Sequence, residues 1–332
     1  MFAREPLLRV TPQGLYCPRA DVHIDPWQPV KRALITHAHS DHARPDCGSY
    51  LAQRETLPIL RLRLGAQPSQ LQGVDYGEEL FINGVRFSFH PAGHVPGSAQ
   101  ILAEADGERW VFSGDYKTES DGVSRPFEPV RCDVFISECT FGLPVFSWRP
   151  QAEVFAELHE WWRRNQAAGV SSVVCAYALG KAQRLLAHLD RSVGRVIVHS
   201  SVWEVCEALG HDLSGFERAN SDIRAQGALV VAPPAAAGGA WLNRFSPYSL
   251  ASLSGWMAIR GMRRRRGVER GFVLSDHADF RGLTDAVAAT GASRVLLTHG
   301  YTAPFSRWLC EKGIDARELD TAFGSEDGEE SP

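Results

Sequence analysis

Hydrophobic residues along the chain group into short runs, and many of these runs end in a polar or ionisable residue. Runs of this length, rich in β-branched and aromatic side chains, are typical of buried β-strands. One of them covers residues 32–36 and leads into a polar loop. The other predicted strands cover residues 85–90, 110–113, 134–137, 172–176, 195–198, 228–231, 272–274 and 295–298.

Helical periodicity separates the later strands. In the segment that starts at Pro150, Val154, Leu158 and Trp161 or Trp162 fall on one face, and Pro150 can be its first helical residue. Shorter helices are predicted at residues 181–189, 202–209, 281–290 and 303–311. The later part of the chain therefore alternates predicted strands with predicted helices.

Composition narrows the class of protein. The 332 residues, 44% hydrophobic and 22% charged, describe an ordinary globular chain of one large domain or two. The net charge of −4 gives no global sign of nucleic-acid binding, so any basic surface must be local. The seven cysteines form no CxxC pair, and neither a signal peptide nor an apolar run of about 18 residues is found, so we predict a cytoplasmic protein without a membrane partner.

Residues 36–42 hold the densest chemistry in the chain. They place His37, His39, Asp41 and His42 directly after a predicted strand. Imidazole and carboxylate are metal ligands, and two ligand pairs suggest two metal ions. The alternative is a surface turn that happens to be rich in histidine.

Other strand ends carry similar residues. Asp25 precedes the histidine cluster and could orient a ligand, although it could equally be a turn aspartate. His94, Asp115 and His299 each follow or end a predicted strand. Taken one at a time, such histidines are often structural and such an aspartate is often a turn residue; their shared setting favours a common site.

The second half contains further candidates for chemistry on a phosphate. His277 follows an apolar strand, or else its segment caps the next helix through Ser275 or Asp276. Lys181, after Gly180, opens a helix where it could receive a phosphate, or it is a plain helix start.

A dense arginine run between residues 260 and 270 includes Arg263 and Arg264. Its side chains could track the phosphates of a nucleic-acid strand. A solvated helix face explains the same charges.

These motifs resemble two known groups. Asp25, the set from His37 to His42, His94 and Asp115, in that order, resemble the metallo-β-lactamase-fold hydrolases. Segments 137–142, 178–183, 275–279 and 298–300 look like the marks of β-CASP nucleases, in which a second domain is inserted into the lactamase fold. Segments 14–18, 24–27 and 254–257 look closest to the bacterial ligase-associated DNA exonucleases.

The resemblance implies an α/β fold: a metallo-β-lactamase αββα sandwich of residues 1–147 and 271–332, with an inserted α/β β-CASP domain at 148–270. It implies two Zn²⁺ ions, with Mn²⁺ as the alternative metal. The first is expected on His37, His39 and His94, the second on Asp41, His42 and His299, with Asp115 bridging them. His277 is expected to be the general acid, paired with Glu138, and Asp41 is counted with these catalytic residues.

The favoured function is a DNA exonuclease in repair or end processing that uses a two-zinc-activated hydroxide. An RNA-processing nuclease is the alternative, because nothing in the motifs distinguishes DNA from RNA. The resemblance also implies functional association with a DNA ligase and a helicase. A small-molecule hydrolase would leave residues 148–270, Glu138 and His277 unexplained, and an inactive nucleic-acid-binding scaffold would be expected to lack ligands.

Overall fold

The computed structural model describes residues 5–220 and 223–319. Within these residues the chain forms two compact units. The first comprises residues 5–120, 124–147 and 277–319, and the second comprises residues 121–123, 148–220 and 223–276. Residues 1–4 and 320–332 of the predicted catalytic domain lie outside the described residues, and the predicted division into a lactamase-fold domain and an insertion stays a prediction.

One sheet of the first unit has six strands in chain order. The strands from β1 to β3 pair antiparallel, and those from β3 to β6 pair parallel. Their bounds are β1 (Arg9–Thr11), β2 (Gly14–Cys17), β3 (Val22–Ile24), β4 (Ala33–Ile35), β5 (Tyr50–Gln53) and β6 (Leu71–Val74).

The other sheet of this unit has seven strands in the order β19-β18-β11-β10-β9-β8-β7. Pairing is antiparallel from β7 to β10 and parallel from β10 through β11 and β18 to β19. The bounds are β7 (Leu80–Ile82), β8 (Val85–Pro91), β9 (Ala99–Ala105), β10 (Glu108–Phe112), β11 (Val134–Cys139), β18 (Arg294–Gly300) and β19 (Asp315–Glu318).

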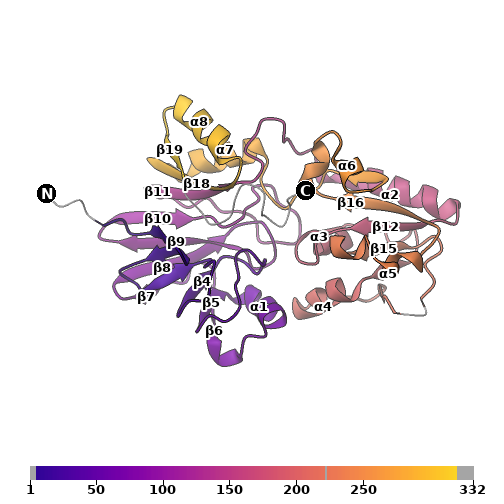
Figure 1. Ribbon diagram of the computed structural model, residues 1–332, viewed down its shortest axis with the longest axis horizontal. Coiled ribbons are helices and arrows are strands. Elements are labelled where there is room, and N and C mark those ends of the chain that lie inside the picture. Colours follow the sequence, from indigo (N-terminus) through magenta and orange to yellow (C-terminus); the bar gives the residue numbers. More distant parts are fainter. Residues whose placement is uncertain (1–4, 221–222, 320–332) are drawn as a thin grey trace. The chain divides into compact units, whose positions relative to one another are not determined.

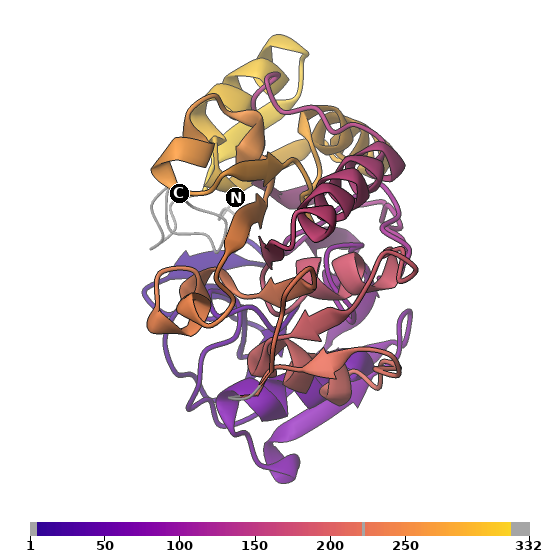
Figure 2. The ribbon, with the colours of Figure 1, turned by 90° about the vertical axis from the view of Figure 1, so that its right-hand side faces the viewer.

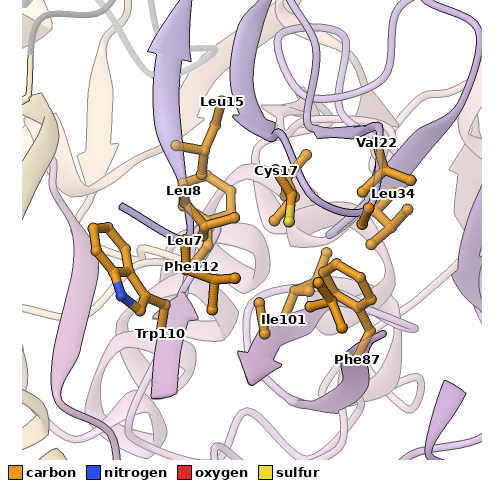
Figure 3. Packing of buried hydrophobic residues seen from close by; sticks show 14 of the residues in the cluster. Leu7, Leu8, Leu15, Cys17, Val22, Leu34, Phe87, Ile101, Trp110 and Phe112 are labelled. Atoms are coloured by element: carbon orange, nitrogen blue, oxygen red, sulfur yellow. The ribbon is translucent and has the colours of Figure 1, made fainter. Parts of the chain in front are cut away.

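The two sheets enclose a hydrophobic core. Leu34 of β4 packs with Phe87 of β8 and Ile101 of β9, as Figure 3 shows. Every residue of β11 is buried, and its side chains alternate: Val134 and Ile136 enter this core, whereas the residue between them points to the other face.

Helices cover that other face. The helices α7 (Phe280–Thr290) and α8 (Thr302–Glu311) lie beside β18 in Figure 1 and contribute Leu283 and Phe305 to a core with Phe135 of β11. A further helix, α1 (Leu57–Leu64), contacts β6. A central strand that is covered on both faces reads as a continuous hydrophobic run, and β11 does so over residues 134–136, Val-Phe-Ile.

The second unit is built on a parallel sheet of order β14-β13-β15-β12-β16-β17, whose strands are coloured pink to orange in Figure 2. Val173 and Val174 of β12 enter different cores, so helices and loops cover both faces. The strands are β12 (Ser171–Cys175), β13 (Val196–Val198), β14 (Glu217–Arg218), β15 (Leu229–Ala232), β16 (Tyr248–Leu253) and β17 (Arg270–Phe272). The helices are α2 (Gln151–Ala167), α3 (Lys181–Ala187), α4 (Ser200–Ala208), α5 (Ala240–Asn243) and α6 (Met262–Arg265), and short 3₁₀ turns occur at Arg54–Thr56, Pro68–Gln70, Pro234–Ala236 and Gly255–Ala258.

The predicted α/β class is confirmed by this alternation of strands and helices. Local details differ from the predictions. Pro150 is the N-cap of α2 and not its first helical residue. Asp279, whose carboxylate accepts from the Gly282 amide at 2.8 Å, caps α7, so neither Ser275 nor Asp276 is the cap. Each helix in the described part of the chain is too short or too polar to cross a lipid bilayer.

Candidate active site

The predicted site residues of the first unit follow strands that run in the same direction within each sheet. Asp25 and the cluster at residues 37–42 follow the parallel strands β3 and β4. His94 and Asp115 follow β8 and β10, which both pair antiparallel with β9 and therefore run the same way. Sites in α/β proteins commonly form where strand carboxyl ends meet, and the chain follows that rule here.

A first group of donors consists of His37, His39, His94 and Asp115, all buried. The Nδ1 of His39 lies 3.1 Å from the Nε2 of His37 and 3.1 Å from the Nε2 of His94. The Oδ2 of Asp115 lies 3.5 Å from His37 Nε2 and 3.7 Å from His94 Nε2. Ligands at about 2.0 Å around a tetrahedral ion stand about 3.3 Å apart, so this spacing suits one metal ion.

A second group of donors consists of His42, Asp115 and His299. The Nε2 of His42 lies 3.4 Å from Asp115 Oδ1 and 3.5 Å from Asp41 Oδ2, and His299 Nδ1 lies 4.0 Å from Asp115 Oδ1. Both His42 Nε2 and Asp41 Oδ1 are buried and have no hydrogen-bond partner within the described residues. Buried polar atoms are seldom left unpaired, so these two suggest a bound cation.

Asp115 belongs to both groups, with Oδ2 toward the first and Oδ1 toward the second. A carboxylate can offer one oxygen to each of two cations. The donor set of imidazoles and carboxylates therefore fits two divalent metal ions that share Asp115.

Asp25 orients the second group. Its Oδ2 accepts from His42 Nδ1 at 2.7 Å and from the Thr36 hydroxyl at 2.5 Å, and its Oδ1 accepts from the Thr36 amide at 2.8 Å. The bond at Nδ1 fixes the ring so that Nε2 is presented as the ligand atom. The Thr36 hydroxyl also lies 3.1 Å from His37 Nδ1, so it links Asp25 to His37. This contact was not predicted from the sequence. The sequence feature that could have indicated it is a hydroxyl residue directly before the first histidine.

Backbone geometry places His299, the last metal-type donor along the chain. The pairing of β11 with β18 shifts register between Glu138 and Cys139, and His299 there has φ +55°. Such an irregularity re-aims a side chain. Gly300 follows with φ +78°, and a Cβ on it would lie 2.3 Å from Thr140 Cα, so only glycine fits.

Glu138 and His277 form a buried pair beside the first donor group. The His277 Nδ1 donates to Glu138 Oε1 at 2.8 Å, and its ring centroid lies 4.7 Å from that of His94. Glu138 also accepts from the Tyr116 amide at 3.0 Å and the Thr140 amide at 3.1 Å. Three donors thus hold the carboxylate. Because it accepts a hydrogen bond from Nδ1, it fixes Nδ1 as a ring nitrogen of His277 that carries a proton.

Burial and neighbouring charge set the protonation of the donor residues. Burial, with the neighbouring imidazoles of His42 and His39, holds the pKa of His37 well below its ordinary value. Burial alone would raise the pKa of Asp115, but the imidazoles of His42 and His277 hold it well below its ordinary value. A neutral imidazole and an ionised carboxylate are the forms that bind metal.

The three residues predicted to contact substrate lie in the second unit. Lys181 is buried, with its Nζ 3.3 Å from Asp276 Oδ2. Arg263 and Arg264 are exposed on α6. Contact of any of them with a substrate stays a prediction.

Known proteins resemble this chain over different lengths. It is 31% identical over 309 residues to a "Probable DNA ligase" of Opitutus terrae, a match that covers 91% of this chain and 30% of that protein. It is 33% identical over 123 residues to an endoribonuclease of Candida albicans, covering 36% and 14%. It is 29% identical over 183 residues to a ribonuclease of Thermus thermophilus, covering 47% and 42%. The chain therefore spans less than half the length of each of these relatives.

A crystal structure of an Enterococcus faecalis protein of unknown function shares the fold, with a TM-score of 0.56 and 12% identity over 80% of this chain and 74% of that one. No family model matches the sequence. The relatives and the histidine and aspartate motifs agree with the resemblance found in the sequence. The chain belongs to the β-CASP group of the metallo-β-lactamase-fold nuclease family.

Proposed function

We propose that this protein is a metal-dependent phosphodiesterase that acts on nucleic acid, and that it is a DNA exonuclease in repair or end processing. The observation that carries the proposal is the arrangement around Asp115. One carboxylate is shared by two groups of metal-type donors, and the buried His277–Glu138 pair lies beside them.

Phosphodiester hydrolysis makes two demands on a site. Negative charge on the phosphate must be neutralised, and the leaving oxygen must receive a proton. Divalent ions held by the two donor groups would supply Lewis-acid stabilisation of that charge and would lower the pKa of water. Zn²⁺ is the metal we propose, with Mn²⁺ as the alternative, because five of the seven donor residues are histidines: His37, His39, His42, His94 and His299.

The His277–Glu138 pair answers the second demand. Glu138 accepts the Nδ1 proton of His277 and favours the protonated ring, so the other nitrogen can deliver a proton to the leaving oxygen. The amides of Tyr116 and Thr140 hold Glu138 still, and therefore the imidazole stays aimed. A positioned general acid of this kind contributes about 10²–10⁴-fold to a rate.

DNA is the proposed substrate because the relative that matches 91% of the chain is named a DNA ligase. The same match supports functional association with a DNA ligase, and we extend the proposal to a helicase partner. RNA is the second candidate, because other relatives are named ribonucleases and endoribonucleases.

The experiment that tests the proposal is a metal-supplemented digestion of single-stranded DNA and matched RNA, each labelled at one end or the other. Wild type is compared with Asp115→Ala and with a control, Asp285→Ala, which removes an exposed carboxylate from α7. We expect stepwise shortening of DNA by wild type and the control and none by Asp115→Ala. Cleavage of RNA alone would make RNA the proposed substrate in place of DNA. If both DNA and RNA stay intact, the nuclease proposal is overturned.

A further inference from the structure

The second unit holds an arginine that stacks on aromatic rings. Arg244 directly follows α5, and its guanidinium carbon lies 4.7 Å from the ring centroid of Trp241 and 4.8 Å from that of Phe245. Phe245 is buried in a hydrophobic core of this unit, and the centroids of the two rings lie 4.6 Å apart. Because a guanidinium is planar and stacks on aromatic faces, the two rings hold this cation in place.

The charge of Arg244 has no acidic partner among the described residues. Other arginines of the unit do have one: Arg195 and Arg218 lie 2.7 Å and 2.6 Å from a glutamate oxygen. The guanidinium of Arg244 makes one hydrogen bond to a described residue, from Nη1 to the Asn220 carbonyl at 3.0 Å. Burial lowers its pKa from the ordinary value, and no described carboxylate opposes that effect. A fixed cation that keeps most of its donors unused is suited to bind an anion.

His199 supplies a second donor next to the same ring. It is the N-cap of α4, and its ring centroid lies 4.8 Å from that of Trp241. Its Nδ1 accepts from the Ser201 amide at 3.1 Å, so the proton of the neutral ring is on Nε2. Burial and the charge of Arg244 lower the pKa of His199, against the opposing effect of Glu204, so the ring is neutral at pH 7. Its Nε2 makes no hydrogen bond to a described residue and can donate to an anion.

Both donors follow strands that pair with each other. The strands β13 and β15 are parallel neighbours, and His199 directly follows β13, whereas α5 and Arg244 come after β15. Ligands of open α/β sheets bind outside the carboxyl ends of such strands. The position of the pair in the sheet therefore agrees with a ligand site.

From these observations we propose that Arg244 and His199 bind a backbone phosphate of a nucleic-acid strand. A guanidinium offers paired donors that match phosphate oxygens, and the chain belongs to a family of nucleases. The identity of the ligand rests on the proposed function, because a free phosphate ion offers the same oxygens. The site is separate from the arginine run at residues 260–270, which the sequence singles out by its charge density alone.

Arg244→Met is the decisive variant. Methionine can fill the space beside the two rings, and no carboxylate loses a partner, so the unit should fold. Arg244→Lys keeps the charge but not the planar fork. His199→Asn keeps a good N-cap for α4 and shortens the donor. Arg163→Met, which removes an exposed cation paired with Asp190, is the matched control.

The measurement is the Kd of end-labelled single-stranded DNA and of matched RNA by fluorescence anisotropy, at several salt concentrations and with a chelator present to stop cleavage. Loss of a charged hydrogen bond should raise the Kd of Arg244→Met about tenfold. The slope of log Kd against log salt should fall by about 0.7, because one phosphate contact is lost. DNA and RNA should be affected alike, since a phosphate contact reads neither base nor sugar.

The other variants separate charge from geometry. Arg244→Lys should keep the salt slope and recover part of the affinity, because it keeps the charge without the fork. His199→Asn should weaken binding with an unchanged slope, because the imidazole is neutral. Arg163→Met should match wild type, and denaturant unfolding checks that each variant is folded.

An Arg244→Met protein with the Kd and salt slope of wild type would overturn the inference. Titration calorimetry with inorganic phosphate tests the other source of the ligand. Phosphate binding that is lost in Arg244→Met, with strand affinity unchanged, would make this a site for the free ion and would also overturn it.

Binding under chelation is independent of cleavage, so the two proposals can fail separately. If wild type binds strands through Arg244 but cleaves none, the proposed nuclease function fails and this inference stands. If wild type cleaves strands and binds them equally well without Arg244, the function stands and this inference fails.

Discussion

Replacing Glu138 by glutamine tests how His277, the proposed general acid, is held. The glutamate accepts three hydrogen bonds, from His277 Nδ1 at 2.8 Å, the Tyr116 amide at 3.0 Å and the Thr140 amide at 3.1 Å. Glutamine has the same shape but only one acceptor oxygen. Whichever way its amide turns, an NH₂ group faces a donor: either the Thr140 amide, or the Tyr116 amide and His277.

The expected magnitude follows from that mismatch. A buried donor left without an acceptor costs about 1–3 kcal/mol, so Glu138→Gln should lower the free energy of unfolding by about that amount. Loss of the carboxylate also removes the charge that favours a protonated, correctly oriented imidazole, so kcat should fall by about 10²–10⁴-fold. Bound metal should stay near the wild-type level, because the Glu138 carboxylate is bonded to His277 and to two amides.

The assay combines kcat on end-labelled DNA, metal content by mass spectrometry and denaturant unfolding. Glu204→Gln, in an exposed pair with Arg218 at 2.6 Å, is the control, and it should change stability by less than about 1 kcal/mol and leave kcat unchanged. A Glu138→Gln enzyme that keeps the full wild-type kcat would refute the reasoning. Loss of metal with loss of activity would instead make Glu138 part of the metal site.

Three further outcomes are expected. Asp115→Asn should lose the metal of both donor groups together with activity, and chelation of the wild-type protein should have the same effect. Metal analysis measures this loss. One retained equivalent of metal in Asp115→Asn would contradict the shared carboxylate. Asp25→Ala removes the acceptor of His42 Nδ1, so metal affinity should fall by about 10–100-fold in a competition titration, and unchanged affinity would argue against orientation of His42. Gly300→Ala should destabilise the protein by more than about 1 kcal/mol in thermal unfolding, because the added Cβ would meet the backbone. The control Gly267→Ala, at φ +63° with nothing within 4 Å of its Cβ, costs only the strain of that conformation. Equal losses of stability would contradict the packing argument.

Much of the cluster of metal-type donors was predictable because it is local in sequence. His37, His39, Asp41 and His42 lie within six residues, and the apolar strand before them predicts a loop at a sheet edge. The glycines next to His94 and His299 mark tight turns. The predicted strands and helices likewise follow from periodicity, which reports the buried face of each element without knowledge of its neighbours.

Other features could not be read from the chain. Among the strands that were not predicted, β5, β6 and β9 mix polar and apolar residues and acquire strand structure from pairing with neighbours. The irregular register at Glu138, which sets His299, depends on how β11 and β18 pair across a wide sequence separation. The role of Thr36 depends on its distance from Asp25.

The sequence by itself determined the kinds of chemistry available. These are imidazoles and carboxylates at strand ends, together with His277 and Glu138. Only the tertiary structure decided which of them meet. Pairing of distant strands brings Asp115 within 3.5 Å of donors on both sides, and it brings His277 to Glu138 across 139 residues. The same holds for Lys181, which sequence leaves open between a phosphate contact and a helix start; its burial beside Asp276 comes from packing, because the charge of a lysine says nothing about the carboxylate that the fold will set against it.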